Sequence, residues 1–209
     1  MEKHLSNNQR HETLKSFIVD KIREAGGEIP FSQYMEYALY TPELGYYMAH
    51  PHIFGGTQGK DFITAPEISA LFGQSLANVC DVLLKNMPDA VILELGAGTG
   101  KLAEDLLDAL EKRGTRPKAY WIVDPSPQLR EQQKERLKKQ SVPIEWFDEL
   151  PQQSFCGIVI GNEVLDAMPA QCFQVTDKSC FELFVKENNG QFEETYKMSS
   201  DPGVQDLAE

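Results

Sequence analysis

Three glycines at alternate positions have the spacing of a ligand-binding turn. They lie in the segment ELGAGTG, residues 94–100, between an apolar run typical of a buried strand and a run typical of a helix. Glycine allows the backbone to turn sharply and to bring its N–H groups against a ligand, and the N-terminus of the following helix favours negative charge. The segment therefore predicts a turn that binds a carboxylate or a phosphate.

Three kinds of glycine-rich turn compete for this segment. A dinucleotide fingerprint that starts at Gly96 needs glycine at position 101, where Lys101 stands. A Walker loop needs glycine at position 95 and serine or threonine at position 102, and both positions hold leucine. The remaining pattern, ExGxGxG, fits the turn that receives the methionine carboxylate of S-adenosylmethionine in methyltransferases. We therefore expect S-adenosylmethionine as the cofactor, bound by Glu94, Gly96, Ala97, Gly98 and Gly100.

Two acids follow the next predicted strands. Asp124 ends a strand about 24 residues after Gly100, where a carboxylate can accept hydrogen bonds from the hydroxyls of a ribose. Asp148 follows the strand after that and is a candidate for the adenine amino group, although a solvated loop acid is an equally good interpretation. Two simpler interpretations stay open: the glycines form only a tight turn, and Asp124 only caps the next helix.

Three further polar residues, Asn162, Glu163 and Asp166, follow the fourth predicted strand. Open α/β sheets bind ligands beyond the carboxyl ends of their strands, so these side chains are expected beside the cofactor. Methyl transfer is an in-line displacement, in which an enzyme mainly aligns the acceptor and handles its proton. Two carboxylates are suited to hold a cationic acceptor such as a guanidinium, and we predict these three residues as catalytic. The alternative is a helix N-terminus that Asn162 caps and the two acids stabilise.

The elements that must position these residues alternate between strands and helices. Strands are predicted at residues 90–95, 119–123, 144–147 and 157–161, and helices at residues 101–113 and 127–139. This alternation is typical of a doubly wound α/β sheet. The predicted fold class is α/β, a Rossmann-like sheet of the class I methyltransferase type, with the visible strands in the order 3-2-1-4.

The flanking segments have other patterns. Apolar residues at helical spacing predict helices at residues 10–25, 32–39 and 67–85, and the glycine-rich stretch at 41–66 is predicted as an ordered lid. After Pro169, alternating apolar residues and the pair Asn189-Gly190 predict an antiparallel meander, followed by a loose tail from Ser199. The predicted segments are a helical lid region at 1–75, a cofactor domain at 76–169 and a hairpin region at 170–209.

Composition excludes several classes of function. A net charge of -12 and a pI near 4.8 argue against a nucleic-acid partner, which demands a positive surface. No apolar run approaches the roughly 20 residues of a membrane span. Met1–Arg10 has neither a secretory nor a transit pattern, so a cytoplasmic location is predicted. The cysteines are scattered and read as reduced thiols, and His50 and His52 have no partners at ligand spacing, so no metal site is predicted.

Several longer segments resemble the MidA-like family of S-adenosylmethionine-dependent methyltransferases. The resemblance extends from about Leu14 to Lys186. Besides the glycine turn, it is carried by YM at 34–35, ALY at 38–40, GYY at 45–47, DFITAPEIS at 61–69, FG at 72–73 and NEVLDAMP at 162–169. Mitochondrial members of the family assist assembly of the respiratory NADH dehydrogenase complex by methylating an arginine of one subunit. The resemblance implies a class I fold with an N-terminal helical lid, methylation of an arginine in a protein substrate such as a respiratory complex subunit, and Asp61 with Thr64 near the cofactor.

The chain departs from this family in two respects. Lys60 stands where the family usually has glycine, which bears on the conformation of the loop before Asp61. Full-length members continue past position 209 with a fifth central strand, so the fourth strand is expected to end the sheet at an exposed edge. Either the chain is a fragment, or a partner protein or a second copy in a homo-oligomer covers that edge.

The leading hypothesis is therefore a methyltransferase that acts on a protein arginine. The alternative is a non-catalytic assembly factor that retains the cofactor pocket and acts by binding a partner protein. A nicotinamide-dependent oxidoreductase is disfavoured by Lys101.

Overall fold

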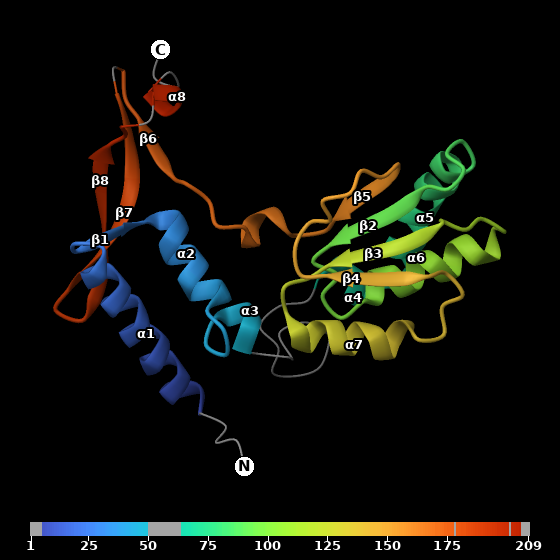
Figure 1. Ribbon diagram of the computed structural model, residues 1–209, viewed down its shortest axis with the longest axis horizontal. Coiled ribbons are helices and arrows are strands. Elements are labelled where there is room, and N and C mark those ends of the chain that lie inside the picture. Colours follow the sequence, from blue (N-terminus) through green and yellow to red (C-terminus); the bar gives the residue numbers. More distant parts are fainter. Residues whose placement is uncertain (1–5, 50–63, 178, 201, 206–209) are drawn as a thin grey trace. The chain divides into compact units, whose positions relative to one another are not determined.

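The chain divides into two units that are built from different segments. The computed structural model describes residues 6–49, 64–177, 179–200 and 202–205 (Figure 1). One unit comprises His50–Asp166, and the other combines Met1–Ala49 with Ala167–Glu209. The predicted site residues from Thr64 to Asp166 all belong to the first unit, and Asp61 lies outside the described residues.

A parallel four-stranded sheet forms the centre of the first unit. Its strands are β2 (Val91–Leu95), β3 (Ala119–Val123), β4 (Ile144–Phe147) and β5 (Gly157–Gly161). They pair in parallel in the order β4-β3-β2-β5. This confirms the predicted α/β fold class and the strand order 3-2-1-4.

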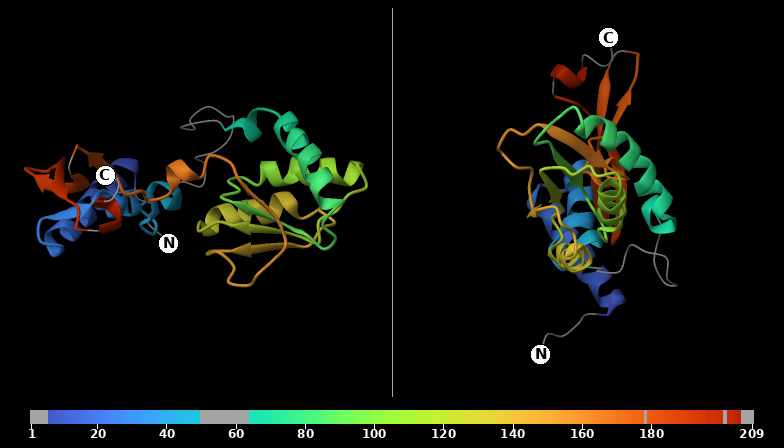
Figure 2. Two further views of the ribbon diagram at one scale, coloured as in Figure 1. Left: turned by 90° about the horizontal axis from the view of Figure 1, so that it is seen from above. Right: turned by 90° about the vertical axis from the view of Figure 1, so that its right-hand side faces the viewer.

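Helices pack against one side of this sheet (Figure 2). They are α4 (Ala65–Ile68), α5 (Ala70–Leu84), α6 (Lys101–Lys112) and α7 (Pro127–Leu137). Alternate strand residues such as Ile92, Tyr120 and Ile122 form a buried core with apolar side chains of α5, α6 and α7. On the opposite side of the sheet, Leu93 and Trp121 are buried in a smaller aromatic cluster. Burial on both sides explains why the two central strands, β2 and β3, are almost wholly apolar in sequence.

The helix predicted at 67–85 is interrupted at one residue. Ser69 is extended (φ -158°, ψ 136°), and its side chain accepts a hydrogen bond from the Leu71 N–H, so it caps α5 and separates it from α4. Apolar periodicity continues through the break, which is why the sequence pattern predicts one helix. The break gives α4 its own direction toward the glycine turn.

The second unit is a small antiparallel sheet with helices. The sheet contains β1 (Glu28–Pro30), β6 (Phe173–Val175), β7 (Cys180–Asn188) and β8 (Gln191–Met198). The predicted meander is confirmed, because β6, β7 and β8 pair antiparallel in sequence order. Asn189 and Gly190 both have positive φ angles, as a two-residue type I′ hairpin turn requires.

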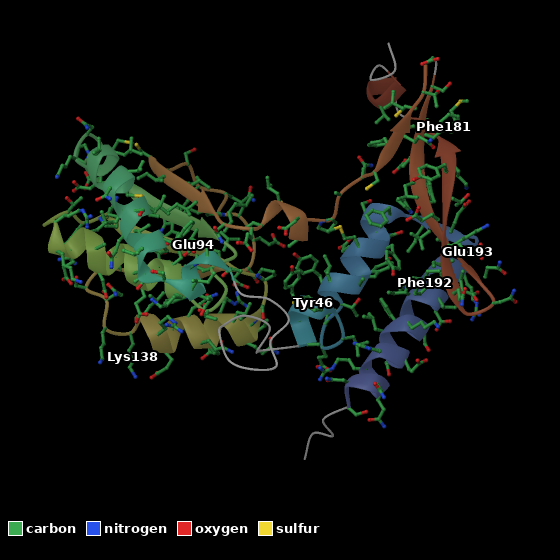
Figure 3. The ribbon with its side chains drawn as sticks, turned by 180° about the vertical axis from the view of Figure 1, so that it is seen from behind. Tyr46, Glu94, Lys138, Phe181, Phe192 and Glu193 are labelled. Atoms are coloured by element: carbon green, nitrogen blue, oxygen red, sulfur yellow. The ribbon has the colours of Figure 1, made fainter. Side chains whose placement is uncertain are left out.

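The described residues of this unit also form helices. They are α1 (Asn7–Glu24), α2 (Phe31–Tyr40), α3 (Tyr46–Ala49) and α8 (Pro202–Gln205). A 3-10 turn at Leu165–Ala167 spans the point in the sequence where the chain passes from one unit to the other. Ile18 and Ile22 of α1 pack with Ile29 and Val185. Tyr34 meets Phe192 of β8 edge to face, and Phe192 is labelled in Figure 3. The tail from Ser199 is predicted as loose, but four of its residues form the short helix α8.

This grouping differs from the predicted segments at 1–75, 76–169 and 170–209. The N-terminal strand β1 pairs with β7, which places Ile29 opposite Val185 and joins the first and last parts of the chain in one unit. A pairing between residues so far apart in sequence leaves no local pattern. Of the predicted lid at 41–66, the structure describes residues 41–49, which include α3, and residues 64–66.

Candidate cofactor site

The glycine turn connects β2 to α6 with three left-handed glycines. The φ angles are 62° at Gly96, 55° at Gly98 and 79° at Gly100, a region that other residues enter at a cost. The N–H of Gly96 donates to the Val123 carbonyl at 2.9 Å, which ties the start of the turn to β3. The N–H of Gly100 donates to the Ala97 carbonyl at 2.8 Å and closes the turn.

The middle of the turn presents backbone donors. Among the described residues, no protein acceptor pairs with the N–H of Ala97, Gly98 or Thr99. The first N–H groups of α6 point toward the N-terminal end of the helix, where the turn lies, and a helix N-terminus carries partial positive charge. This donor set fits a carboxylate, as the glycine pattern predicts.

Side chains of α7 donate hydrogen bonds to two carbonyls of the turn. Gln133 Nε2 donates to the Gly98 carbonyl at 2.9 Å, and Arg136 Nε donates to the Thr99 carbonyl at 2.9 Å. Arg136 also forms a 3.1 Å ion pair with Glu104 of α6. The turn is therefore held through its carbonyls, which leaves its N–H groups for a ligand.

Helix α4 reaches the same turn from another direction. The Thr99 hydroxyl donates to a carboxylate oxygen of Glu67, which lies in the last part of α4. Thr64 immediately precedes this helix and is half-buried, with no side-chain hydrogen bond to the helix N-terminus. Thr64, predicted near the cofactor, is thus three residues from a side chain that contacts the glycine turn.

Asp124 lies at the end of β3, one strand away from the turn, and is 3% exposed. Its Oδ1 accepts from the Ser126 N–H at 3.0 Å and its Oδ2 accepts from Gln133 Nε2 at 2.8 Å. Burial raises the pKa of Asp124, and the hydrogen bonds from Ser126 and Gln133 act in the opposite direction. Each carboxylate oxygen can accept a further hydrogen bond, so these contacts leave capacity for ribose hydroxyls. The cap of α7 is Ser126, whose side chain accepts from the Leu129 N–H, and not Asp124.

Glu94 occupies the interior of the unit beneath the turn (Figure 3). It is 2% exposed, and its Oε2 accepts a 2.8 Å hydrogen bond from the hydroxyl of Tyr120 on β3. Burial and, to a smaller extent, the nearby Asp124 raise the pKa of Glu94 to about 7, against the hydrogen bond from Tyr120, which lowers it. The structure thus places this predicted cofactor residue in the core, in contact with Tyr120.

The predicted acceptor residues follow β5, the strand next to β2. Val164 lies against the glycine turn, because a Cβ atom added to Gly96 would come within 3.4 Å of Val164 Cγ2. Glu163 and Asp166 are exposed, and Asn162 is half-buried. Glu163 has a φ of 52°, which is uncommon for a residue with a side chain and costs energy. A short 3-10 turn stands where the alternative interpretation requires a helix.

The structure therefore brings most predicted residues to one end of the parallel sheet. Asp148 directly follows β4 and is exposed, two strands away from the glycine turn. A groove of about 630 Å³ between α7 and β4, with Arg130, Lys134 and Trp146 in its lining, contains none of the predicted site residues. Four side chains that form hydrogen bonds with the glycine turn, with Glu94 or with Asp124 are not predicted from the sequence, because no local pattern marks them: Glu67, Tyr120, Gln133 and Arg136.

Comparison with known proteins decides the family. The model of a family described as S-adenosyl-L-methionine-dependent methyltransferases, Methyltransf_28, matches residues 72–209. This chain belongs to that MidA-like methyltransferase family. Its cofactor is accordingly S-adenosylmethionine, as predicted.

Relatives and solved structures agree with this assignment. The chain is 31% identical over 199 residues to the mitochondrial protein arginine methyltransferase NDUFAF7 homolog of Caenorhabditis elegans, covering 82% of the chain and 46% of that protein. For human NDUFAF7 the identity is 29%, covering 80% of the chain and 44% of the relative. A COG1565 superfamily protein from Burkholderia thailandensis, bound to S-adenosyl-homocysteine, superimposes with a TM-score of 0.85 at 39% identity, over 95% of this chain and 53% of that one.

The comparisons also bear on length and location. The chain spans about half the length of the curated relatives it matches. The predicted cytoplasmic location is wrong, because those relatives are named as mitochondrial proteins. The prediction relied on the lack of a transit pattern in the first ten residues, and that observation does not determine a compartment.

The described residues contain neither a membrane-spanning helix nor a cluster of metal ligands. None of the helices there has the length and apolar character needed to cross a membrane. In the same residues, no group of three or more His, Cys, Asp or Glu side chains is arranged to hold a metal ion, and His50 and His52 lie outside this range.

Proposed function

We propose that this chain forms the cofactor-binding part of a protein arginine methyltransferase. The observation that carries the proposal is the set of open N–H groups at Ala97–Thr99 with the buried carboxylate of Asp124 on the next strand. The relatives are named protein arginine methyltransferases, which supports arginine as the acceptor.

The proposed binding mode assigns one part of the cofactor to each element. The N–H groups of the glycine turn bind the methionine carboxylate, and Asp124 accepts hydrogen bonds from the ribose hydroxyls. Asp148, at the end of β4, is proposed to meet the adenine, and Thr64 and Asp61 are proposed to lie near the cofactor. When bound, S-adenosylmethionine supplies a methyl group on a sulfonium centre.

The segment after β5 is proposed to hold the acceptor. Glu163 and Asp166 are exposed carboxylates that can accept hydrogen bonds from a guanidinium, whose fixed fork of donors matches a carboxylate. Asn162 orients the same group through its side-chain amide. Because transfer requires alignment of the acceptor nitrogen and removal of its proton, these residues act by positioning the acceptor and by receiving that proton.

A second candidate function is assembly through partner binding without catalysis. It is favoured by one feature of the parallel sheet, which ends at β5 in the described residues and leaves Val159 58% exposed. A buried parallel strand usually has neighbours on both sides. We propose that a partner protein, such as a respiratory complex subunit, or a second copy of the chain covers this edge.

Titration calorimetry and labelled methyl transfer together test these proposals. Wild-type protein is expected to bind S-adenosylhomocysteine, and Asp124→Asn is expected to weaken that binding by about tenfold or more, because one acceptor of the ribose hydroxyls loses its charge. Binding that is equal in the two proteins would contradict the cofactor mode. Labelled transfer to arginine that Glu163→Gln lowers by about tenfold to a hundredfold supports the first function, whereas cofactor binding without any transfer in wild type supports the second.

A further inference from the structure

One buried side chain connects the two halves of the proposed cofactor site. Gln133 lies on α7, and its exposed fraction is 0%. Its Nε2 donates to the Gly98 carbonyl at 2.9 Å and to Asp124 Oδ2 at 2.8 Å. Its Oε1 accepts from Trp146 Nε1 at 3.1 Å. The side chain therefore touches the glycine turn, the ribose acid and β4 at the same time.

The orientation of the amide follows from its partners. A primary amide has two N–H donors, which here face two acceptors, and one oxygen, which here faces an indole N–H that can only donate. The reversed orientation would set oxygen against oxygen and N–H against N–H. Glutamine is therefore the side chain whose length and donor pattern satisfy all three neighbours in a site without water exposure.

The packing around Gln133 also depends on the glycine turn. A Cβ atom added to Gly100 would lie 3.4 Å from both Cα and Cγ of Gln133. The third glycine thus has a packing role besides its φ of 79°, because it lets α7 come close enough for the amide to reach Gly98. The turn and α7 consequently form one interlocked structure.

We propose that Gln133 is a positioning residue for S-adenosylmethionine, which fixes the distance between the amides that bind its carboxylate and the acid that binds its ribose. The inference rests on the proposed binding mode. Gln133 acts through Gly98 and Asp124 and does not itself touch the cofactor. Its loss is expected to affect both ends of the cofactor, since both ends share this one tether.

The charge state of Asp124 provides a readout that distinguishes positioning from simple packing. The Ser126 N–H and Gln133 donate to this carboxyl and favour its charged form, and Arg130 of α7 acts in the same direction. The nearby acid is Glu94 of β2, whose pKa is raised by Asp124. Removal of the Gln133 donor therefore raises the pKa of Asp124. Affinity for S-adenosylhomocysteine should then begin to fall at a higher pH on acidification.

Two variants are expected to change the pH profile in opposite directions. Gln133→Met keeps the approximate volume and removes the donors, so its affinity falls by about tenfold to a hundredfold at pH 8 and further at pH 6. Gln133→Glu places a second carboxylate against Asp124, so its affinity is equally low at pH 8. At pH 6 that affinity recovers in part, because one shared proton restores a hydrogen bond between the two carboxyl groups.

The matched control is Gln140→Met, just after α7. Gln140 makes the same kind of amide-to-carboxylate hydrogen bond, at 2.8 Å to Asp108, but away from the glycine turn. Its substitution is expected to leave affinity and pH profile unchanged. Circular dichroism melts of all three variants show whether each is folded.

Calorimetric titration with S-adenosylhomocysteine at pH 6 and pH 8 tests the inference on the full chain. Opposite pH profiles for the two Gln133 variants support it. Wild-type affinity and profile in folded Gln133 variants overturn it while leaving the cofactor site intact. Absence of binding to wild type instead overturns the proposed function, and the inference with it.

A second measurement applies if neither variant folds. The side-chain amide resonances of Gln133 are then followed in nitrogen-labelled wild type during addition of S-adenosylhomocysteine. A shift of these resonances supports the inference, and no shift overturns it.

Discussion

The glycine turn and the proposed acceptor segment, residues 162–166, follow neighbouring strands, but the protein holds them in different ways. The carbonyls of Gly98 and Thr99 in the turn are bonded by side chains of α7, and the hydroxyl of Thr99 is bonded to Glu67 of α4. The segment after β5 has exposed carboxylates at Glu163 and Asp166, and Glu163 adopts an unfavourable φ angle.

The described residues therefore fix the proposed cofactor site more firmly than the proposed acceptor site. A cofactor site works best when its donors are fixed before the ligand arrives, because no ordering cost is then paid on binding. The proposed acceptor segment contacts the turn through Val164 but keeps its charged groups in solvent. The proposed binding of an acceptor therefore requires contacts beyond those of this segment.

Substitution of the central glycine should produce the largest effect on the fixed region. Gly98→Val forces a branched side chain into a φ of 55° and crowds the open amides, so affinity for S-adenosylhomocysteine should fall by more than about 100-fold. Titration calorimetry measures this loss. The matched control is Gly114→Val, at a φ of 71° and with open space around its Cβ, which should carry similar strain without loss of affinity. Equal losses in both variants would show that general destabilisation, and not the turn, is responsible.

A buried acid makes the stability of the fixed region depend on pH. The pKa of Glu94 is about 7 in the folded protein and near 4.5 when exposed, so the folded state binds this proton more tightly than the unfolded chain. This contribution to stability is fully present below about pH 4.5 and is lost as pH rises through about 7, with a total of roughly 3 kcal/mol.

Glu94→Gln should remove that loss, because a neutral amide oxygen still accepts from Tyr120. We expect the variant to exceed wild type in free energy of unfolding at pH 8 by up to roughly 3 kcal/mol, and to match it more closely at pH 5. Urea denaturation at the two pH values provides the measurement. A difference independent of pH would mean that Glu94 does not titrate in this range.

A substitution in the exposed segment after β5 should change methyl transfer and leave stability and cofactor affinity unchanged. Glu163→Gln removes one proposed acceptor carboxylate but no buried contact, so labelled methyl transfer should fall by about tenfold to a hundredfold. Cofactor affinity and the free energy of unfolding should remain within about 0.5 kcal/mol of wild type. The control Glu149→Gln changes another exposed acid, in the loop between β4 and β5, and should leave transfer unchanged. A loss of cofactor affinity in Glu163→Gln would erase the contrast between the two regions.

The smallest expected effect is a gain in stability at the same position. Glu163→Gly relieves the strain of a φ of 52° and should raise the free energy of unfolding by about 1 kcal/mol while it abolishes the carboxylate's role in transfer. Chemical denaturation checks the gain. Lower stability than in wild type would show that the Glu163 side chain makes a stabilising contact.

The two regions also differ in how much of them can be predicted from sequence. Local patterns predict the parallel strands, because each is a short apolar run that ends in glycine or a polar residue, and their order follows from the family of folds. The hairpin at Asn189-Gly190 is equally local. The pairing of Ile29 with Val185 is not, since it depends on a register between distant segments.

The supporting residues of the site are hidden for a related reason. Gln133 stands in a helix with several other glutamines, and only the fold shows that it is buried against Gly98 and Asp124. Glu94 has the position of a cofactor residue in the sequence pattern, yet the strand turns its carboxylate toward Tyr120 in the core. Sequence identifies the backbone turn and the acid after the next strand, whereas the contacts that hold them come from tertiary packing.

A crystal structure with S-adenosylhomocysteine is the sharpest test of the proposed binding mode. The homocysteine carboxylate should lie about 3 Å from the N–H groups of residues 97–99, and both ribose hydroxyls should contact Asp124, with Gln133 still bridging Gly98 and Asp124. Ligand density at another end of the sheet, or a ribose that does not contact Asp124, would contradict that binding mode.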